Sequence, residues 1–209
     1  MTAVPTTPKG LRTRGQLLDA AREVFAEKGF VNTRMADIAE RGGMSMGGLY
    51  RYFENKESIF EALVIDIHEE LFSSSRAPGV KFEDDPYAAL HAANLGYLSH
   101  YYENRDVMRT LIEASTFDPK FRDIWWNMRN RHVERFVSLV RDKMGITHLD
   151  GIDVLGATEA MACMVEQAAY VWFAHEERQK RTMSLEEAAE ITTRTWFRLF
   201  FPTDGRAKN

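Results

Sequence analysis

The sequence predicts an all-α fold, and three features lead to that conclusion. Apolar residues recur at helical spacing through most of the chain, and capping residues or glycines bound many of these segments. No run rich in Val, Ile and Thr alternates polar with apolar residues, so we expect no β-sheet. The 209 residues are 44% hydrophobic and 28% charged, which suffices for a globular core.

About nine helices are expected, and several have a clear start or end signal. Thr33 and Ser45 are good N-caps, and an Asp-Pro pair at 85–86 and at 118–119 starts two later helices. Gly29 ends the first helix because glycine readily adopts a left-handed backbone. The expected helices cover about 11–28, 34–41, 45–52, 56–75, 86–102, 104–115, 119–144, 151–178 and 185–200.

The segment TRMADIAERGGMSMGGLYRYFENKESIF, residues 33–60, carries the functional signal. Two short helices joined by a glycine-containing turn form the helix-turn-helix layout. Ile38, Ala39, Met44 and Leu49 are expected to form a small core with Phe25 of the first helix. With Leu49 pointing inward, the first turn of the third helix points outward, and in this motif that turn enters the DNA major groove.

Polar groups around this motif suit a polyanion. Residues 1–57 hold nine Lys and Arg against seven Asp and Glu, a net charge of +2, whereas the remaining residues hold 18 against 24, a net charge of −6. Helix N-termini can hold phosphates, and basic arms can reach the minor groove. The candidate DNA-binding residues are Thr33, Arg34, Ser45, Met46, Gly47, Gly48, Tyr50, Arg51, Tyr52 and Lys56, with Arg41 and an arm carrying Lys9, Arg12 and Arg14 as further candidates.

These residues resemble the N-terminal domain of the TetR family of bacterial repressors. The parts that carry the resemblance are Gly29-Phe30, Thr33, RMADIAERGG and LYRYFENKESIF, within about residues 14–63. The resemblance implies an all-α homodimer whose last two helices form a four-helix bundle with the partner, and an effector pocket in the C-terminal domain. The chain departs from the family at 45–48, which reads Ser-Met-Gly-Gly, so these residues do not specify an operator sequence.

Four segments follow from this organisation. We expect a disordered arm over 1–9, the DNA-binding domain over 10–56, an effector-binding and dimerisation domain over 57–203, and a disordered tail over 204–209.

Aromatic and Met residues in the second domain predict a pocket for a hydrophobic small-molecule effector, with ordinary core as the alternative. Asn94, Glu113, Glu166 and Gln167 are candidates to orient a polar end of the ligand. The candidate pocket residues are Tyr97, Tyr101, Met108, Phe117, Phe121, Trp125, Met128, Met161, Met164, Val165, Ala168 and Trp172.

The last two helices are expected to form the dimer interface. The proposed contacts are Leu155, Ala162, Ala169, Val171, Ile191, Thr195, Phe197 and Leu199. A dimer has to hold its two recognition helices about 34–36 Å apart to meet successive major grooves of a palindromic operator. We expect the effector to change the tilt of the helix over 56–75, and so to release a repressor from double-stranded DNA.

Other classes of function have less support. The chain has no HExxH, G-x-S-x-G, P-loop or dinucleotide motif, which argues against an enzyme and against a metal or cofactor. Cys163 lies in an apolar context and is expected to be a core residue. No apolar run reaches the length of a membrane span and no secretory signal is present, so we expect a cytoplasmic protein. A helical ligand-binding protein without DNA function, and an activator, remain open.

Overall fold

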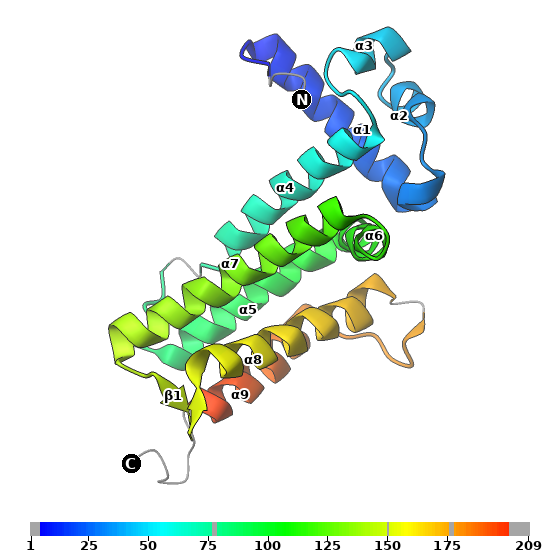
Figure 1. The fold of residues 1–209 in the computed structure, drawn as a ribbon. Helices are drawn as coiled ribbons and strands as arrows, with labels where there is room; N and C mark the ends of the chain where they lie inside the picture. Colours follow the sequence, from blue (N-terminus) through cyan, green and yellow to red (C-terminus); the bar gives the residue numbers. More distant parts are fainter. Residues whose placement is uncertain (1–4, 77–78, 150, 176–177, 201–209) are drawn as a thin grey trace. The chain divides into compact units, whose positions relative to one another are not determined.

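The computed structural model describes residues 5–76, 79–149, 151–175 and 178–200 and has the expected all-α fold (Figure 1). A helix-turn-helix domain comes first and a larger helical domain follows. The helices are α1 (Pro8–Asn32), α2 (Met35–Arg41), α3 (Met46–Tyr50), α4 (Lys56–Ser74), α5 (Pro86–Glu103), α6 (Arg105–Ser115), α7 (Pro119–Met144), α8 (Val154–Ala169), the π-helix η1 (Tyr170–Ala174) and α9 (Leu185–Phe200). No helix within these ranges is apolar over a length that would cross a bilayer. The expected tail over 204–209 lies outside the described residues.

Several of the predicted helix signals are confirmed. Gly29 interrupts the helical backbone with a φ of 69°, and Gly145 follows α7 with a φ of 67°. The Ser45 hydroxyl accepts a hydrogen bond from the Gly48 amide at 3.2 Å, and the Asp85 carboxylate accepts one from the Ala88 amide at 2.9 Å. These local signals work because a helix end needs partners for its unpaired amides whatever the tertiary context.

The N-terminal end of α1 differs from the prediction. The Thr7 hydroxyl accepts a hydrogen bond from the Gly10 amide at 3.2 Å, and Pro8 occupies the first turn, so α1 begins at Pro8 instead of about residue 11. Lys9 and Arg12 are therefore helical and do not belong to a disordered arm. Arg14 is helical too, and its guanidinium lies 5.4 Å from the centre of the Phe53 ring.

The expectation of no β-sheet was wrong at one place. Strand β1 (His148–Leu149) pairs antiparallel with β2 (Ile152–Asp153), and α8 starts at Val154 instead of residue 151. Strands of two residues are too short to show alternation in the sequence. Helix α8 also does not continue as a regular helix to 178, because five residues after Ala169 form the π-helix η1. An apolar pattern does not distinguish a π turn from an α turn.

The chain divides into two compact units. Unit 1 contains the residues up to 69 together with 106–125, and unit 2 contains 70–105 together with the residues from 126 on. The division falls inside α4 and inside α7, whereas the sequence placed a single domain boundary at 56/57. Unit 1 therefore holds more than the helix-turn-helix, since it also includes most of α4, α6 and the start of α7.

Unit 1 is centred on an aromatic cluster, formed by Phe25 and Phe30 of α1, Phe60 of α4 and Phe121 of α7. Neighbouring ring centres lie 4.8–5.9 Å apart, and Phe25, Phe60 and Phe121 are fully buried. Phe117 meets the edge of this cluster, 6.2 Å from Phe30, while remaining 53% exposed. Phe121, one of the predicted pocket residues, therefore belongs to the core of unit 1, and Phe117, another, lies at the edge of that core.

Unit 2 is built around α5 packed along α9, with α7 and α8 against them (Figure 1). The Asn94 side-chain amide of α5 donates a hydrogen bond to the Thr193 hydroxyl of α9 at 3.0 Å, and both residues are buried. Tyr87 donates to Glu190 at 2.8 Å and packs against Phe197, with ring centres 5.2 Å apart. These polar contacts fix the register of the two helices because buried polar groups need matched partners.

Gly96 permits a close approach within unit 2. A β-carbon placed on Gly96 of α5 would overlap the Ser74 carbonyl oxygen at the end of α4. We expect Gly96→Ala to lower the free energy of unfolding by about 1–3 kcal/mol, measured by urea denaturation, because backbone must move to relieve the overlap. Gly15→Ala is the control: nothing lies within 4 Å of that position in α1, so it should leave stability unchanged or raise it. Equal stabilities of the two variants would contradict the close approach.

Candidate DNA interface and effector cavity

Helices α2 and α3 form the helix-turn-helix on a buried core. The Met44 amide donates to the Ala39 carbonyl at 2.9 Å, and Gly43 has a φ of 60°, which turns the chain between the two helices. Ile38, Ala39 and Leu49 are at most 3% exposed. These three predicted core residues are thus buried, whereas Met44, the fourth residue predicted for this turn, is half-buried. The buried Leu49 directs the opposite face of α3 outward.

The outward face of α3 carries several predicted DNA-binding residues. Tyr50 is 47% exposed and Met46 is 38% exposed, values that are high for residues of this size. The exposed members of the predicted set are Arg34, Ser45, Met46, Gly47, Tyr50 and Arg51, and Tyr52 is half-buried. Gly48 is buried instead, and a methyl group there would collide with the Met44 side chain. Gly48 therefore serves the packing of the turn and not the outward face.

Thr33 and Lys56 have structural roles that the sequence reading missed. Thr33 does not cap α2: Arg34 takes the N-cap position, and its amide donates to the Asp37 carboxylate at 2.9 Å. Thr33 is only 2% exposed and its hydroxyl donates to the Gly29 carbonyl at 2.7 Å, so this hydroxyl is not available to a phosphate. The sequence analysis predicted Thr33 and Lys56 as DNA contacts from their positions at the starts of α2 and α4.

The Lys56 ammonium lies at the connection between α1 and α2. It donates hydrogen bonds to the carbonyls of Phe30, Val31 and Thr33 at 2.8, 3.1 and 3.1 Å, and it lies 4.7 Å from the centre of the Phe30 ring. An ammonium has three donors, and these bonds use all of them. Lys56 therefore holds the start of α4 to the end of α1 instead of facing DNA.

Arg41 is also occupied within unit 1. Its guanidinium pairs with Glu23 at 2.7 Å and with Glu27 at 2.8 Å. The hydrogen bond from Arg41 lowers the pKa of the Glu27 carboxyl. Arg41 thus joins α2 to α1, and we remove it from the candidate DNA contacts.

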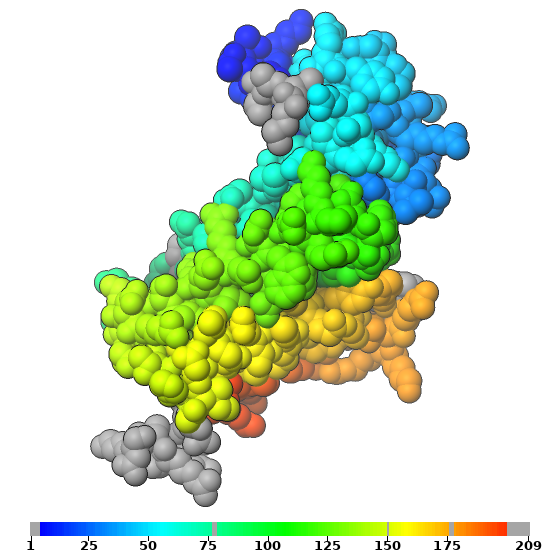
Figure 2. Space-filling view, viewed as in Figure 1, coloured from blue at the N-terminus to red at the C-terminus, as the bar shows by residue number. Residues whose placement is uncertain are grey.

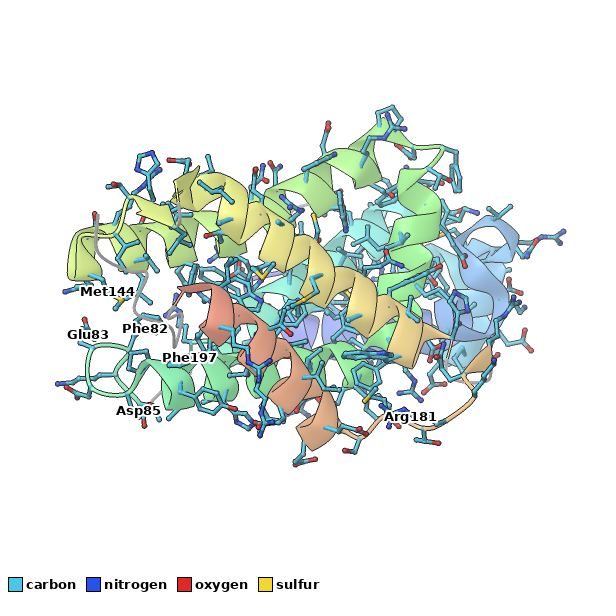
Figure 3. All side chains as sticks on the ribbon, turned by 90° about the horizontal axis from the view of Figure 1, so that it is seen from below. Phe82, Glu83, Asp85, Met144, Arg181 and Phe197 are labelled. Carbon is cyan, nitrogen blue, oxygen red and sulfur yellow. The ribbon has the colours of Figure 1, made fainter. Side chains whose placement is uncertain are left out.

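A cavity in unit 2 is the candidate effector site. Its volume is about 100 Å³, and a neighbouring cavity of about 290 Å³ shares five of its lining residues, including Arg135, Phe136 and Ser75. The smaller cavity is lined by Ser75, Leu90, Ala93, Asn94, Tyr97, His132, Val133, Arg135, Phe136, Thr158, Ala162, Val165, Glu166 and Trp196. Phe82 and Glu83 line the larger one, and Figure 3 shows them at the end of unit 2 where α7 finishes near Met144.

The structure brings few of the predicted pocket residues to this cavity. Tyr97 and Val165 line it, as do Asn94 and Glu166, two of the predicted orienting residues. The other predicted pocket residues do not line it: Tyr101, Met108, Phe117, Phe121, Trp125, Met128, Met161, Met164, Ala168 and Trp172. The sequence reading weighted large apolar side chains, and these fill cores as readily as they line cavities.

The predicted pocket set did not include the part of the wall that α7 contributes. His132, Val133, Arg135 and Phe136 all line the smaller cavity. Their spacing of one, three and four residues on one helix face was the available signal. Trp196 of α9 was also missed, and its ring meets Phe136 edge-on with centres 4.7 Å apart.

Glu166 is a cavity carboxyl with an unusual environment. Burial raises its pKa to about 7, against the opposing effect of Arg129, whose guanidinium lies 3.4 Å away. Burial together with the Glu166 charge also raises the pKa of the Tyr97 phenol. Arg129 in turn donates to the Cys163 sulfur at 3.1 Å, and Cys163 is exposed, so the expectation of a core cysteine was wrong.

Only part of the predicted dimer surface is exposed. Leu155, Val171 and Ile191 are 39%, 38% and 39% exposed, and Thr195 is also exposed. Ala169 is fully buried within the chain, and Ala162 is half-buried and lines the cavity. Phe197 packs on Tyr87 and is half-buried, as is Leu199.

The Lys56 contacts predict a loss of stability on mutation. Lys56→Met removes the donor from three carbonyls, and we expect the free energy of unfolding to fall by about 1–3 kcal/mol in urea denaturation. Lys9→Met, at an exposed position of α1, is the control and should change stability by less than about 0.5 kcal/mol. Unchanged stability of Lys56→Met with weaker, less salt-dependent DNA binding would return Lys56 to the phosphate contacts.

Glu166 predicts a pH dependence of stability. Its pKa rises from 4.5 to about 7 on folding, so the folded state binds more protons in that interval and stability falls as the pH rises through it. Glu166→Gln stays neutral, and we expect its free energy of unfolding to gain about 1–3 kcal/mol relative to the wild type between pH 4.5 and pH 8. Glu113→Gln, at an exposed position of α6, should follow the wild type. Parallel pH profiles for Glu166→Gln and wild type would contradict the assignment.

Comparisons with known proteins agree with the helix-turn-helix geometry. Residues 17–63 match the model of the bacterial regulatory proteins of the tetR family. The transcriptional regulator TtgR of Pseudomonas putida is 34% identical over 85 residues, which cover 41% of this chain and 40% of TtgR. The repressor KstR2 of Rhodococcus jostii is 27% identical over 124 residues, 54% of this chain and 61% of KstR2. The chain thus spans about 40–60% of the length of these relatives.

Solved structures extend the similarity to the whole fold. PfmR, a TetR family regulator from Thermus thermophilus, has a TM-score of 0.68 and 26% identity, covering 87% of this chain and 97% of PfmR. A tetR family protein from Rhodococcus RHA1 has a TM-score of 0.70 and 21% identity, covering 90% and 97%. The helix-turn-helix of this chain is thus similar in sequence to the tetR family of bacterial regulatory proteins, and its fold is similar to solved structures of TetR family regulators.

Proposed function

We propose that this chain is a homodimeric repressor that binds a palindromic operator and leaves it when a hydrophobic small molecule occupies unit 2. The observation that carries the proposal is the exposure of Met46, Tyr50 and Arg51 on α3 above a fully buried Leu49. These side chains present an apolar, a phenolic and a cationic group on or directly after a five-residue helix, and such groups suit contacts to DNA. The tetR family match and the repressor KstR2 among the relatives support DNA as that partner.

The DNA contacts fall into two kinds. Tyr50 and Arg51 supply a hydroxyl and a guanidinium suited to backbone phosphates or base edges, and these groups set register and affinity. Met46 and Gly47 lie in the first turn of α3, where Met46 offers an apolar contact to a thymine methyl group. The lack of hydrogen-bonding side chains at these two positions leaves base selection to Arg34, Ser45 and the shape of the DNA.

The proposed dimer forms through α8 and α9. Leu155 and Val171 on α8, with Ile191 and Thr195 on α9, are the exposed members of the predicted interface. Figure 2 shows α8, in yellow, lying at the surface with α9, in red, beside it. Isologous packing of this surface with a second copy would give the two-fold symmetry that a palindromic operator requires.

Helix α4 is the proposed link between effector and DNA. Near the start of α4, the Lys56 ammonium donates hydrogen bonds to three backbone carbonyls of unit 1. At its other end, Arg135 donates to the Phe72 carbonyl at 2.8 Å and to the Ser75 carbonyl at 3.1 Å, and Arg135 lines the cavity. A ligand that changes the position of Arg135 therefore acts on a helix that is attached at both ends. Differential binding of this kind shifts the population between two arrangements.

Selection of bound sequences from a random DNA pool tests the function directly. The selected sequence should be palindromic, and its affinity should fall steeply between two salt concentrations because cationic groups displace counterions from phosphates. A helical ligand-binding protein without DNA function would enrich no sequence. Enrichment of a site without two-fold symmetry would contradict the dimer.

Tyr50→Phe and Arg51→Ala test the placement of α3. Each is expected to weaken binding of the selected operator about tenfold or more while leaving the melting temperature unchanged, because both side chains are exposed. Lys143→Ala removes an exposed cation from α7 of unit 2 and should bind like the wild type. Wild-type affinity of both α3 variants in a gel-shift titration would show that α3 does not enter the groove.

The dimer surface is tested by a double charge substitution. Leu155→Glu combined with Ile191→Glu places carboxylates on the exposed apolar surface, and we expect sedimentation equilibrium to give a monomer. Ile65→Glu, at a 46% exposed position of α4, is the matched control and should stay dimeric. A dimer that survives the double substitution would place the interface elsewhere.

A further inference from the structure

Three arginines surround one buried aromatic ring in unit 2. The guanidinium carbons of Arg131, Arg135 and Arg76 lie 3.9, 4.3 and 5.3 Å from the centre of the Phe72 ring. Phe72 is 7% exposed, so the arginines cover a ring that is almost fully removed from water. We name Arg76, Arg131 and Arg135 the arginine cluster. Like charges held this closely favour a nearby anion.

Arg135 is the member of the arginine cluster that reaches both cavities. It lines each of them, together with Ser75, whose hydroxyl accepts a hydrogen bond from Arg135 at 2.8 Å. Its three hydrogen bonds, to Ser75 twice and to the Phe72 carbonyl, use at most three of the five N–H groups of a guanidinium. At least two donors therefore remain for a ligand in the cavity.

The charge of Arg135 is not balanced by the protein around it. Within the part of the chain that the structure describes, no carboxylate lies within ion-pair distance of Arg135. Burial and the positive charges of Arg76 and Arg131 lower the pKa of Arg135 to about 10. A bound anion would oppose this lowering of the Arg135 pKa, because it supplies the opposite charge beside the guanidinium.

The carboxylates of the cavities do not fill this role. Glu166 is already paired with Arg129 at 3.4 Å. Arg129 lies on a different turn of α7 from Arg135. Glu83 is exposed and lines only the larger cavity. The remaining wall is mainly apolar, with Val133, Phe136 and Leu90 available to an aromatic or aliphatic body.

We propose that the effector of this protein is a small amphipathic oxyanion, whose carboxylate or phosphate binds Arg135 and the Ser75 hydroxyl while its apolar body lies against Val133 and Phe136. This inference rests on the proposed effector role of the cavity and narrows the ligand to one charge class. His132 lies beside the same group, with its Nδ1 3.5 Å from the Ser75 oxygen, and adds a further polar contact.

The same arginine also holds the end of α4. A ligand anion and the carbonyls of Phe72 and Ser75 would accept hydrogen bonds from the same guanidinium. The strength of the Arg135 hydrogen bonds to the end of α4 therefore depends on whether the anion is bound. A neutral ligand in the cavity would lack this direct effect. The charge of the ligand therefore affects the hydrogen bonds between Arg135 and α4 as well as the affinity of the ligand.

Isothermal titration of the wild-type protein with three matched probes tests the charge class. The probes are 4-phenylbutyrate, the neutral 4-phenylbutanol and the cationic 4-phenylbutylamine, and 3-phenylpropyl phosphate distinguishes a phosphate from a carboxylate preference. We expect at least one oxyanion to bind tenfold or more tightly than the alcohol, because it gains charge-assisted hydrogen bonds. Equal or tighter binding of the alcohol or the amine, or no binding of any probe, would overturn the proposal.

Substitution of Arg135 locates the site. Arg135→Gln should bring the affinity for the oxyanion down to that of the alcohol, and Arg135→Lys should retain part of the preference. Arg141→Gln, on the same helix and paired with Asp153 at 3.2 Å, is the control and should keep the full preference. A preference that survives in a folded Arg135→Gln protein would overturn the proposal, and if that variant does not fold, Arg135→Lys and the wild-type probe series still decide it.

Operator binding without any ligand is measured in parallel. A wild-type protein that binds its operator but shows no preference for the oxyanion would reject this inference alone, whereas a wild-type protein that binds no operator would reject the proposed function. The two failures are therefore distinguishable.

Discussion

The burial of the aromatic cluster is the constraint on which the DNA-binding unit depends. Phe25 and Phe30 of α1 meet Phe60 of α4 and Phe121 of α7, so residues nearly 100 positions apart share one core. Each buried ring contributes about 1.5–3 kcal/mol, and this fixes the directions of α1 and α4. The helix-turn-helix core of Ile38, Ala39 and Leu49 is small and belongs to the same unit as this larger core.

Two cationic side chains, one near each end of α4, donate hydrogen bonds to carbonyls at helix ends. Lys56 satisfies the carbonyls that α1 leaves at its end, and Arg135 satisfies those that α4 leaves at its own end. Both are helix-end interactions, because the last carbonyls of a helix have no partner within it.

The cavity illustrates where pattern-based reasoning stops. The sequence predicted a pocket of aromatic and Met residues, but Phe121 fills a core, and the wall of the cavity includes His132, Arg135 and Trp196, which were not predicted. Helical spacing identifies the residues of one face, and it does not say whether that face meets another side chain or an empty space. Of the polar residues proposed to orient a ligand, Asn94 and Glu166 do line the cavity.

The sequence by itself determined the all-α class, most helix boundaries and the helix-turn-helix, because caps, glycines and apolar spacing act over one or two turns. It also determined the exposure of Tyr50 and Arg51, since Leu49 of the same helix had to face the core. The tertiary structure decided which polar groups remain available: Thr33 and Lys56 are consumed by carbonyls of α1, and Arg135 is drawn to the end of α4. Those outcomes depend on helix ends that meet only after packing, and no local pattern encodes which carbonyls a long cationic side chain will find.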